Sequence, residues 1–257
     1  MRGRGRVTTF AVRLTVMRRQ FLIDQLTRSK LLGPARTLKW EASKAIGIRA
    51  GTFSQDREDV LLLEHFNLPP RGTYIDVGAN HPWLSSNSYL LYRRGWRGVT
   101  VEPIDWLAQL QRKHRPRDTC LNAACSATRG SLPFYLMEPH ALSTLSEAER
   151  NRLVSRGLAR LVSEERVPVL TVADITGLLL DHRLDVLFTD AEDFEIEVLN
   201  GVNWVEGRPK VIVAELASLT SNRSGEITEF LSERGYSLAL ESKINGFYAD
   251  GSQDDRD

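Results

Sequence analysis

The chain has 257 residues, of which 42% are hydrophobic and 26% are charged, and its formal net charge is +1. This length and composition fit one large globular domain with an extension. The only two cysteines, Cys120 and Cys125, exclude a disulfide framework and lie in no metal-binding motif. We therefore expect two reduced thiols that pack as small hydrophobic groups.

The small net charge hides an uneven distribution of charge. Residues 1–50 carry twelve Lys or Arg and two acidic residues, a formal charge of +10, whereas the rest of the chain carries 22 basic and 31 acidic groups. A basic segment before an acidic body predicts contact with an anionic surface, which is a membrane, nucleic acid or an acidic partner; the alternative is a solvated amphipathic extension. The acidic body argues against a groove that tracks nucleic acid.

Membrane-spanning and secretory segments are not expected. No apolar run is long enough to cross a bilayer. Arginines interrupt the first apolar stretch and no small-residue cleavage site follows it, unlike a secretory signal. We expect a cytoplasmic protein that can also lie at the inner membrane surface through residues 1–50.

Hydrophobic periodicity and turn residues predict alternating strands and helices after residue 50. The expected strands are residues 73–77, 98–102, 119–123, 132–137, 167–170, 184–190, 210–215, 236–240 and 245–249. The expected helices are residues 52–66, 83–94, 104–114, 171–180, 193–200 and 224–234. We expect residues 1–50 to form a basic helical extension, residues 51–250 one α/β domain with a mostly parallel sheet, and residues 251–257 a disordered acidic tail.

Residues 144–164 interrupt this alternation. They are strongly charged, and four leucines recur at helical spacing: Leu145, Leu153, Leu158 and Leu161. Thr144 and Glu147 fit a capping box at the start of a helix. The segment therefore predicts a helical insertion that covers the site or shapes its substrate side.

Residues 74–82 form a short apolar strand that ends in Asp76, followed by a turn with one glycine. A pyrophosphate site needs several glycines, and the Asp76 carboxylate would repel a diphosphate. The same carboxylate suits a cationic sulfonium amino acid, while Gly78 allows close backbone approach and Asn80 can donate and accept. The pattern favours S-adenosylmethionine over a dinucleotide; the alternative is a strand-to-helix turn with a capping acid.

A second strand end with an acid follows at Glu102. A carboxylate there can accept hydrogen bonds from both ribose hydroxyls, and Pro103 can wall an adenine. Asn122, beside two alanines at the end of the third strand, is a weaker candidate for the adenine. The alternative for Glu102 is an exposed surface acid.

Several motifs together resemble the FkbM family of S-adenosylmethionine-dependent methyltransferases over roughly residues 52–249. They are Phe53-Ser54-Gln55, residues 76–82, 86–89 and 95–98, Val101-Glu102-Pro103, residues 189–195 and Glu215. The resemblance implies a class I methyltransferase fold, a Rossmann-like seven-stranded sheet with helices on both faces. It also implies methyl transfer to a hydroxyl oxygen, on a saccharide or a glycosylated or polyketide-type metabolite.

The expected cofactor contacts are Gln55, Asp76, Gly78, Ala79, Asn80, Glu102, Pro103 and Asn122. The resemblance places the Ser-Gln element that contains Gln55 over the cofactor. Thr52 and Gln55 alternatively fit a helix capping box.

Acidic residues after the strand at 184–190 are the candidates for the chemistry. A hydroxyl acceptor needs a base, for which Asp190, Glu192 and His81 are placed suitably. Alternatively, Asp190 and Glu215, on adjacent strand ends, hold a divalent cation that acidifies the acceptor. The structural alternatives are acids that cap the helix at 193–200 and a loop histidine that caps a helix.

Asp193 stands where the resemblance places the glycine of an Asp-x-Glu-Gly element. Its carboxylate could tighten the turn, repel the cofactor's carboxylate or add a metal ligand. A second hypothesis is therefore an impaired methyltransferase-like scaffold, docked to a membrane or partner through residues 1–50.

A nucleotide-linked oxidoreductase is disfavoured because the further glycines are missing. We assign four aromatic residues to packing: Trp83, Tyr89, Tyr92 and Trp96.

Overall fold

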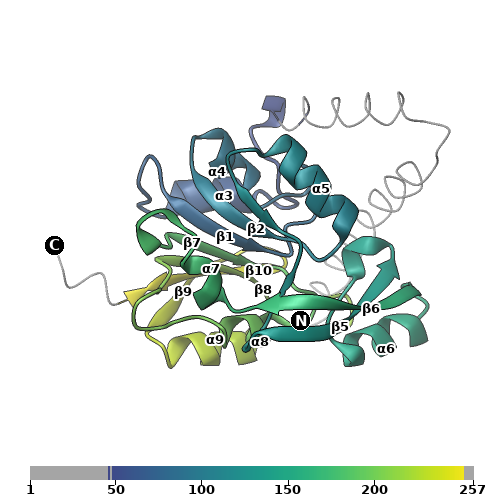
Figure 1. The fold of residues 1–257 in the computed structure, drawn as a ribbon. Helices are drawn as coiled ribbons and strands as arrows, with labels where there is room; N and C mark the ends of the chain where they lie inside the picture. Colours follow the sequence, from purple (N-terminus) through teal and green to yellow (C-terminus); the bar gives the residue numbers. More distant parts are fainter. Residues whose placement is uncertain (1–45, 47, 252–257) are drawn as a thin grey trace.

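The computed structural model describes residue 46 and residues 48–251 (Figure 1). The predictions for the basic extension over residues 1–45 and 47, and for the tail over residues 252–257, lie outside the described residues. Within the described part of the chain, no helix has the length and apolar character needed to cross a bilayer.

A seven-stranded sheet forms the centre of the molecule, in the order β3-β2-β1-β7-β8-β10-β9. Its strands are β1 (Thr73–Val77), β2 (Arg97–Val101), β3 (Thr119–Leu121), β7 (Val186–Thr189), β8 (Val211–Glu215), β9 (Tyr236–Glu241) and β10 (Asn245–Asp250). β1 pairs in parallel with β2 and β7, whereas β10 runs antiparallel to both of its neighbours. The expected α/β class with a mostly parallel seven-stranded sheet is confirmed.

Helices cover both faces of this sheet because alternate strand residues point to opposite sides. On β8, Val211 and Val213 join the core with α3 (Glu58–His65) and α4 (Tyr89–Arg93). Ile212 and Ala214 join the opposite core with α7 (Val172–Thr176), α8 (Glu195–Leu199) and α9 (Ser224–Ser232). The four aromatic residues assigned to packing are all buried in the first of these cores.

A smaller sheet, in the order β4-β6-β5, lies to one side of the main sheet together with helix α6 (Figure 1). Its elements are β4 (Ala124–Cys125), β5 (Gly130–Glu138), the 3₁₀ turn η1 (His140–Leu142), α6 (Glu147–Ser155) and β6 (Arg160–Leu170). Helix α5 (Asp105–His114) packs on this sheet through Leu107.

The prediction of one helix over residues 144–164 is wrong in its second half. Residues 160–164 belong to β6, which pairs antiparallel with β5 from Arg160 to Val169. Pairing with β5 gives the backbone N–H and C=O groups of these residues hydrogen-bond partners. This pairing outweighs the helical propensity of the segment. The cap also differs from the expected Thr144–Glu147 box, because the Ser146 side chain accepts from the N–H of Glu149.

Two helices begin later than expected. Helix α3 begins at Glu58, since the Asp59 carboxylate accepts from the hydroxyls of Thr52 and Ser54. The capping box between Thr52 and Gln55 is therefore wrong. Helix α4 begins at Tyr89 instead of residue 83. By contrast, the expected cap at Thr171 is confirmed as a full capping box, although α7 ends at Thr176 rather than near residue 180.

Candidate active site

A cavity lies where the carboxyl ends of the parallel strands β1, β2, β7 and β8 meet. The order of the strands reverses between β1 and β7, which is where open α/β sheets bind ligands. Phe134 of β5, residues 140–145 and Leu219 also line it. Of the predicted site residues, the cavity brings together Gln55, Asp76, Gly78, Ala79, Asn80, Glu102, Pro103, Asp190, Glu192 and Glu215. His81 and Asn122 are not among the lining residues.

The turn after β1 is held tightly between its two neighbouring strands. The N–H groups of Gly78 and Ala79 both point to the carbonyl of Val101, at 3.0 and 3.2 Å. Gly78 has φ +77°, and a Cβ there would lie 1.9 Å from the carbonyl oxygen of Asp190. Only glycine fits this position, because another backbone segment passes against it.

Glu102 is buried and fastens the loops around it. Its two carboxylate oxygens accept the backbone N–H groups of Asn80 at 2.8 Å and of Ile104 at 2.7 Å. Burial raises the pKa of Glu102 to about 7. The Asn122 amide donates to the carbonyls of Glu102 and Pro103, so Asn122 holds the backbone of this segment without lining the cavity. The exposed-acid alternative is wrong. Each carboxylate oxygen can accept a second hydrogen bond, as recognition of two hydroxyls requires.

Asp76 is held by a buried hydrogen-bond chain that the sequence did not reveal. Ser88 donates its hydroxyl to Asp76, and the buried Arg115 donates to Ser88 at 2.9 Å and to the hydroxyl of Tyr74 at 2.6 Å. Burial raises the pKa of Asp76 to about 6, against the opposing charge of Arg115. From sequence, an arginine at the end of an amphipathic helix is expected on the surface. No local signal therefore predicts that Arg115 is buried.

Three carboxylates gather on the other side of the cavity. Ligand oxygens of Asp190, Glu192 and Glu215 all lie within 4.8 Å of one another. Helix α8 begins at Glu195, and its N-cap residue, Phe194, makes no side-chain cap hydrogen bond. Clustered carboxylate oxygens are the donors that Mg²⁺ and Ca²⁺ prefer, and the three residues fit such an ion.

His81 is packed in the interior. It is 2% exposed, its ring meets Trp83 edge-on at 4.6 Å, and its Nδ1 accepts the N–H of Leu84 at 3.2 Å. Burial lowers the pKa of His81 to about 3. We therefore leave His81 out of the proposed chemistry. His140 lines the cavity instead, with its Nε2 3.3 Å from the side-chain oxygen of Asn80, and no sequence motif marks it.

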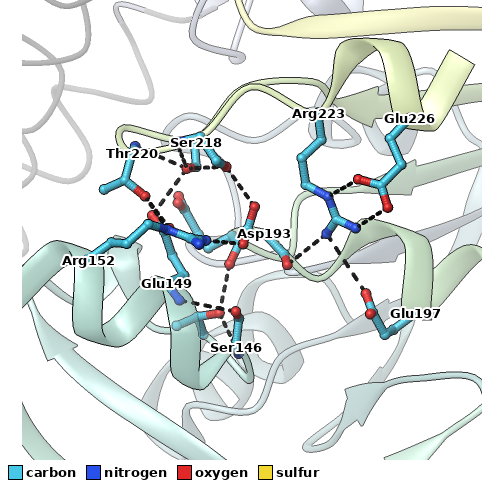
Figure 2. Close-up of polar contacts among 12 residues, drawn as sticks. Ser146, Glu149, Arg152, Asp193, Glu197, Ser218, Thr220, Arg223 and Glu226 are labelled. Carbon is cyan, nitrogen blue, oxygen red and sulfur yellow. Dashed lines mark hydrogen bonds and ion pairs between the residues drawn. The ribbon is translucent and has the colours of Figure 1, made fainter.

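Asp193 is not among the residues that line the cavity, and its side chain takes part in a polar network with Arg152 (Figure 2). Its φ of 74° lies in the left-handed region that favours glycine, as the resemblance leads one to expect. Its carboxylate accepts hydrogen bonds from Arg152 and from Ser221 at 2.6 Å, and it is not part of the three-carboxylate cluster. Of the three expected consequences of an aspartate here, tightening of the turn matches this geometry.

Glu195 provides a test of the electrostatics behind the site. It is buried, its carboxylate accepts the N–H of Ala191 at 3.0 Å, and burial raises its pKa to about 8. A carboxyl whose folded pKa is raised contributes stability that is present below its unfolded pKa and is lost as pH rises through about 8.

Glu195→Gln should therefore match the wild type in melting temperature near pH 5 and exceed it at pH 8.5, where each kcal/mol corresponds to roughly 2–4 °C. Thermal melts across this pH range measure the difference. The matched control is Glu229→Gln on the exposed side of α9, which should show no such trend. An equal shift at all pH values would contradict the expected titration of Glu195.

Comparison with known proteins gives one family match. The model for the methyltransferase FkbM domain matches residues 76–238, more than half of the chain. No curated protein matches the sequence. Among solved structures, a TehB-like SAM-dependent methyltransferase from Corynebacterium glutamicum ATCC 13032 is 10% identical, with a TM-score of 0.43 over 85% of this chain and 100% of that one. An O-methyltransferase from Bacillus cereus in complex with SAH is 16% identical, with a TM-score of 0.36 over 90% of this chain and 97% of that one.

Proposed function

This chain belongs to the methyltransferase FkbM domain family and is an S-adenosylmethionine-dependent methyltransferase, and we propose that it methylates a hydroxyl oxygen. The proposed acceptor is a saccharide or a glycosylated or polyketide-type metabolite. The observation that supports the proposal best is the meeting of Asp76, Glu102 and Asp190 in one cavity, although they end three different strands.

The residues present fit the cofactor. Glu102 offers two buried carboxylate oxygens at the end of β2, which suit the paired hydroxyls of a ribose. Asp76 places a second buried carboxylate near the turn after β1, which suits a cation rather than a phosphate. When bound, S-adenosylmethionine supplies an electrophilic methyl group on a positively charged sulfur.

The protein has two tasks in such a reaction, to orient the acceptor oxygen and to take its proton. We propose that Asp190 and Glu192 carry out both, because they line the cavity from the strand end next to β1. A correctly placed base contributes roughly 10²–10⁴-fold to the rate. Gln55 and Asn80 line the same cavity and are proposed as further cofactor contacts.

A divalent cation is an alternative way to make the acceptor oxygen more acidic. Asp190, Glu192 and Glu215 would hold it with one carboxylate oxygen each. A bound cation lowers the pKa of an oxygen that binds it, so a separate base becomes less important. Dependence of the rate on added Mg²⁺ separates the two versions.

A labelled-methyl transfer screen tests the proposal directly. The intact chain is incubated with S-adenosylmethionine labelled on the methyl group and with sets of saccharides and glycosylated metabolites, with and without EDTA. We expect label to appear in a hydroxyl-bearing acceptor, in a product stable to base, as an ether is. Label found only on nitrogen or carbon would overturn the O-methyl assignment, and loss of transfer with EDTA would favour the cation.

The basic segment supports a second proposal, that residues 1–50 bring the enzyme to an anionic membrane surface or to an acidic partner. Its +10 formal charge contrasts with the acidic remainder of the chain. Salt screens the attraction between opposite charges, so such a contact should weaken as the salt concentration rises. Pelleting of the intact chain with anionic and with neutral vesicles at two salt concentrations tests the membrane version, which equal partitioning to both vesicle types would exclude.

A further inference from the structure

A polar network joins three segments that lie far apart in the sequence (Figure 2). The segments are helix α6, the turn after β7 and the loop after β8. Asp193 in the turn contacts both of the others, because its carboxylate accepts from Arg152 of α6 and from Ser221 of the loop. We propose that Asp193 is a positioning residue that fixes α6 and this loop to the turn carrying Glu192. It thereby sets the shape of the acceptor side of the cavity.

The network continues between α6 and the loop. Glu149 of α6 is fully buried and accepts hydrogen bonds from Arg152 at 2.8 Å, from Ser218 at 3.1 Å and from Thr220. Arg152 Nε also lies 3.0 Å from the hydroxyl of Thr220. Burial of a carboxylate without such partners costs free energy, so Glu149 should keep its hydrogen bonds to Arg152 and to the loop. Arg152 in turn donates to Asp193 and so connects both to the turn.

The turn itself is held in a conformation that needs support. Glu192 and Asp193 are consecutive left-handed residues, with φ of 50° and 74°. Such conformations persist in residues other than glycine only when surrounding contacts impose them. Here Thr144 donates to the carbonyl of Glu192 at 2.7 Å, and Arg223 donates to the carbonyl of Asp193 at 3.0 Å. The Asp193 side chain adds the link to α6, and it is 10% exposed.

The held segments form one wall of the cavity. Thr144 and Leu145 precede α6, Leu219 lies in the loop after β8, and Glu192 lies beside Asp193; all four line the cavity. The ends of β1 and β2 form the cofactor wall of the cavity, where Glu102 takes its hydrogen bonds from groups outside this network. Glu102 accepts from Asn80 and Ile104. Loss of the Asp193 carboxylate should therefore loosen the acceptor wall and leave the cofactor wall intact.

Hydrogen exchange of the full chain, followed by mass spectrometry, tests this separation without an acceptor. In Asp193→Gly, amides of α6 and of residues 217–223 should exchange at least 10-fold faster, while those of β1 and β2 remain unchanged. Glycine adopts a positive φ without strain, so the loosening reports the lost carboxylate. Asp193→Asn keeps one acceptor oxygen and should give an intermediate result. The matched control, Glu147→Gln, removes an exposed ion pair with Arg150 from the same helix and should change nothing.

The role in catalysis rests on the proposed function and has its own readout. With an acceptor from the labelled-methyl screen, Asp193→Gly should raise the acceptor KM at least 10-fold and change the KM for S-adenosylmethionine less than threefold. Unchanged exchange in α6, or equally faster exchange in β1 and β2, would overturn the proposal. So would an equal rise of both KM values. Because exchange is measured without turnover, a failure of the positioning role is distinct from a failure of the methyl-transfer assignment.

Discussion

Glu102→Ala is expected to weaken binding of S-adenosylhomocysteine by roughly 30–1,000-fold, or about 2–4 kcal/mol. The substitution removes the buried acceptor proposed for the ribose hydroxyls. It also frees the N–H groups of Asn80 and Ile104, which the carboxylate holds at 2.8 and 2.7 Å. Isothermal titration calorimetry with S-adenosylhomocysteine measures the loss.

Two controls separate lost recognition from lost folding. Asp105→Asn changes an exposed carboxylate three residues away, bonded to Gln109, and should bind like the wild type. Glu102→Gln keeps an oxygen for one of the two backbone N–H groups. It should therefore stay folded in a thermal melt and still lose affinity for S-adenosylhomocysteine. If Glu102→Ala remains folded in a thermal melt and binds S-adenosylhomocysteine like the wild type, the cofactor assignment fails.

Asp190→Asn is expected to lower kcat by roughly 10²–10⁴-fold, as removal of a placed base does. Asparagine has the same shape, so the affinity for S-adenosylhomocysteine should change less than threefold. The measurement uses labelled-methyl transfer to an acceptor found in the screen, and Asp181→Asn, at the opposite edge of the sheet, is the control. Under the cation alternative, the same variant would recover activity at high Mg²⁺, because only its affinity for the ion is reduced.

A kcat of Asp190→Asn within threefold of the wild type would remove Asp190 from the chemistry. Glu192 would then be the remaining candidate base from the acid cluster. His140 would also need testing, since it lines the cavity beside Asn80. The hypothesis of an impaired scaffold predicts a different result, binding of S-adenosylhomocysteine with no transfer to any acceptor.

The cofactor half of the cavity was accessible from sequence because its signals are local. Asp76 and Glu102 each end a strand that reads as an apolar run, and a single glycine follows Asp76. Carboxyl ends of neighbouring parallel strands meet at one edge of a sheet, so two such strand ends predict a shared site. The structure places both residues in one cavity, as expected. The structure gives a further reason for Gly78, since the backbone of Asp190 passes against it.

Sequence reasoning failed where an assignment depended on burial. His81 follows directly on the motif and was taken as a candidate base, yet it packs against Trp83 in the interior. Arg115 was not singled out, although it is fully buried and holds Ser88 and Tyr74 beneath Asp76. Whether a polar side chain faces a cavity, the core or solvent depends on what packs over it, which its neighbours in sequence do not specify.

The amino-acid sequence by itself determined the α/β class, most of the strands and helices, and the acids at the carboxyl edge of the sheet. These follow from periodicity and turn chemistry within stretches of about ten residues. Only the tertiary structure decided that residues 160–164 form a strand, that His140 rather than His81 lines the cavity, and that Asp193 joins α6 to the loop after β8. The contacts responsible link residues 41 apart for Arg152 and Asp193, and 71 apart for Glu149 and Thr220. Residues so far apart in the sequence come into contact only in the folded chain, so local sequence patterns do not predict these pairs.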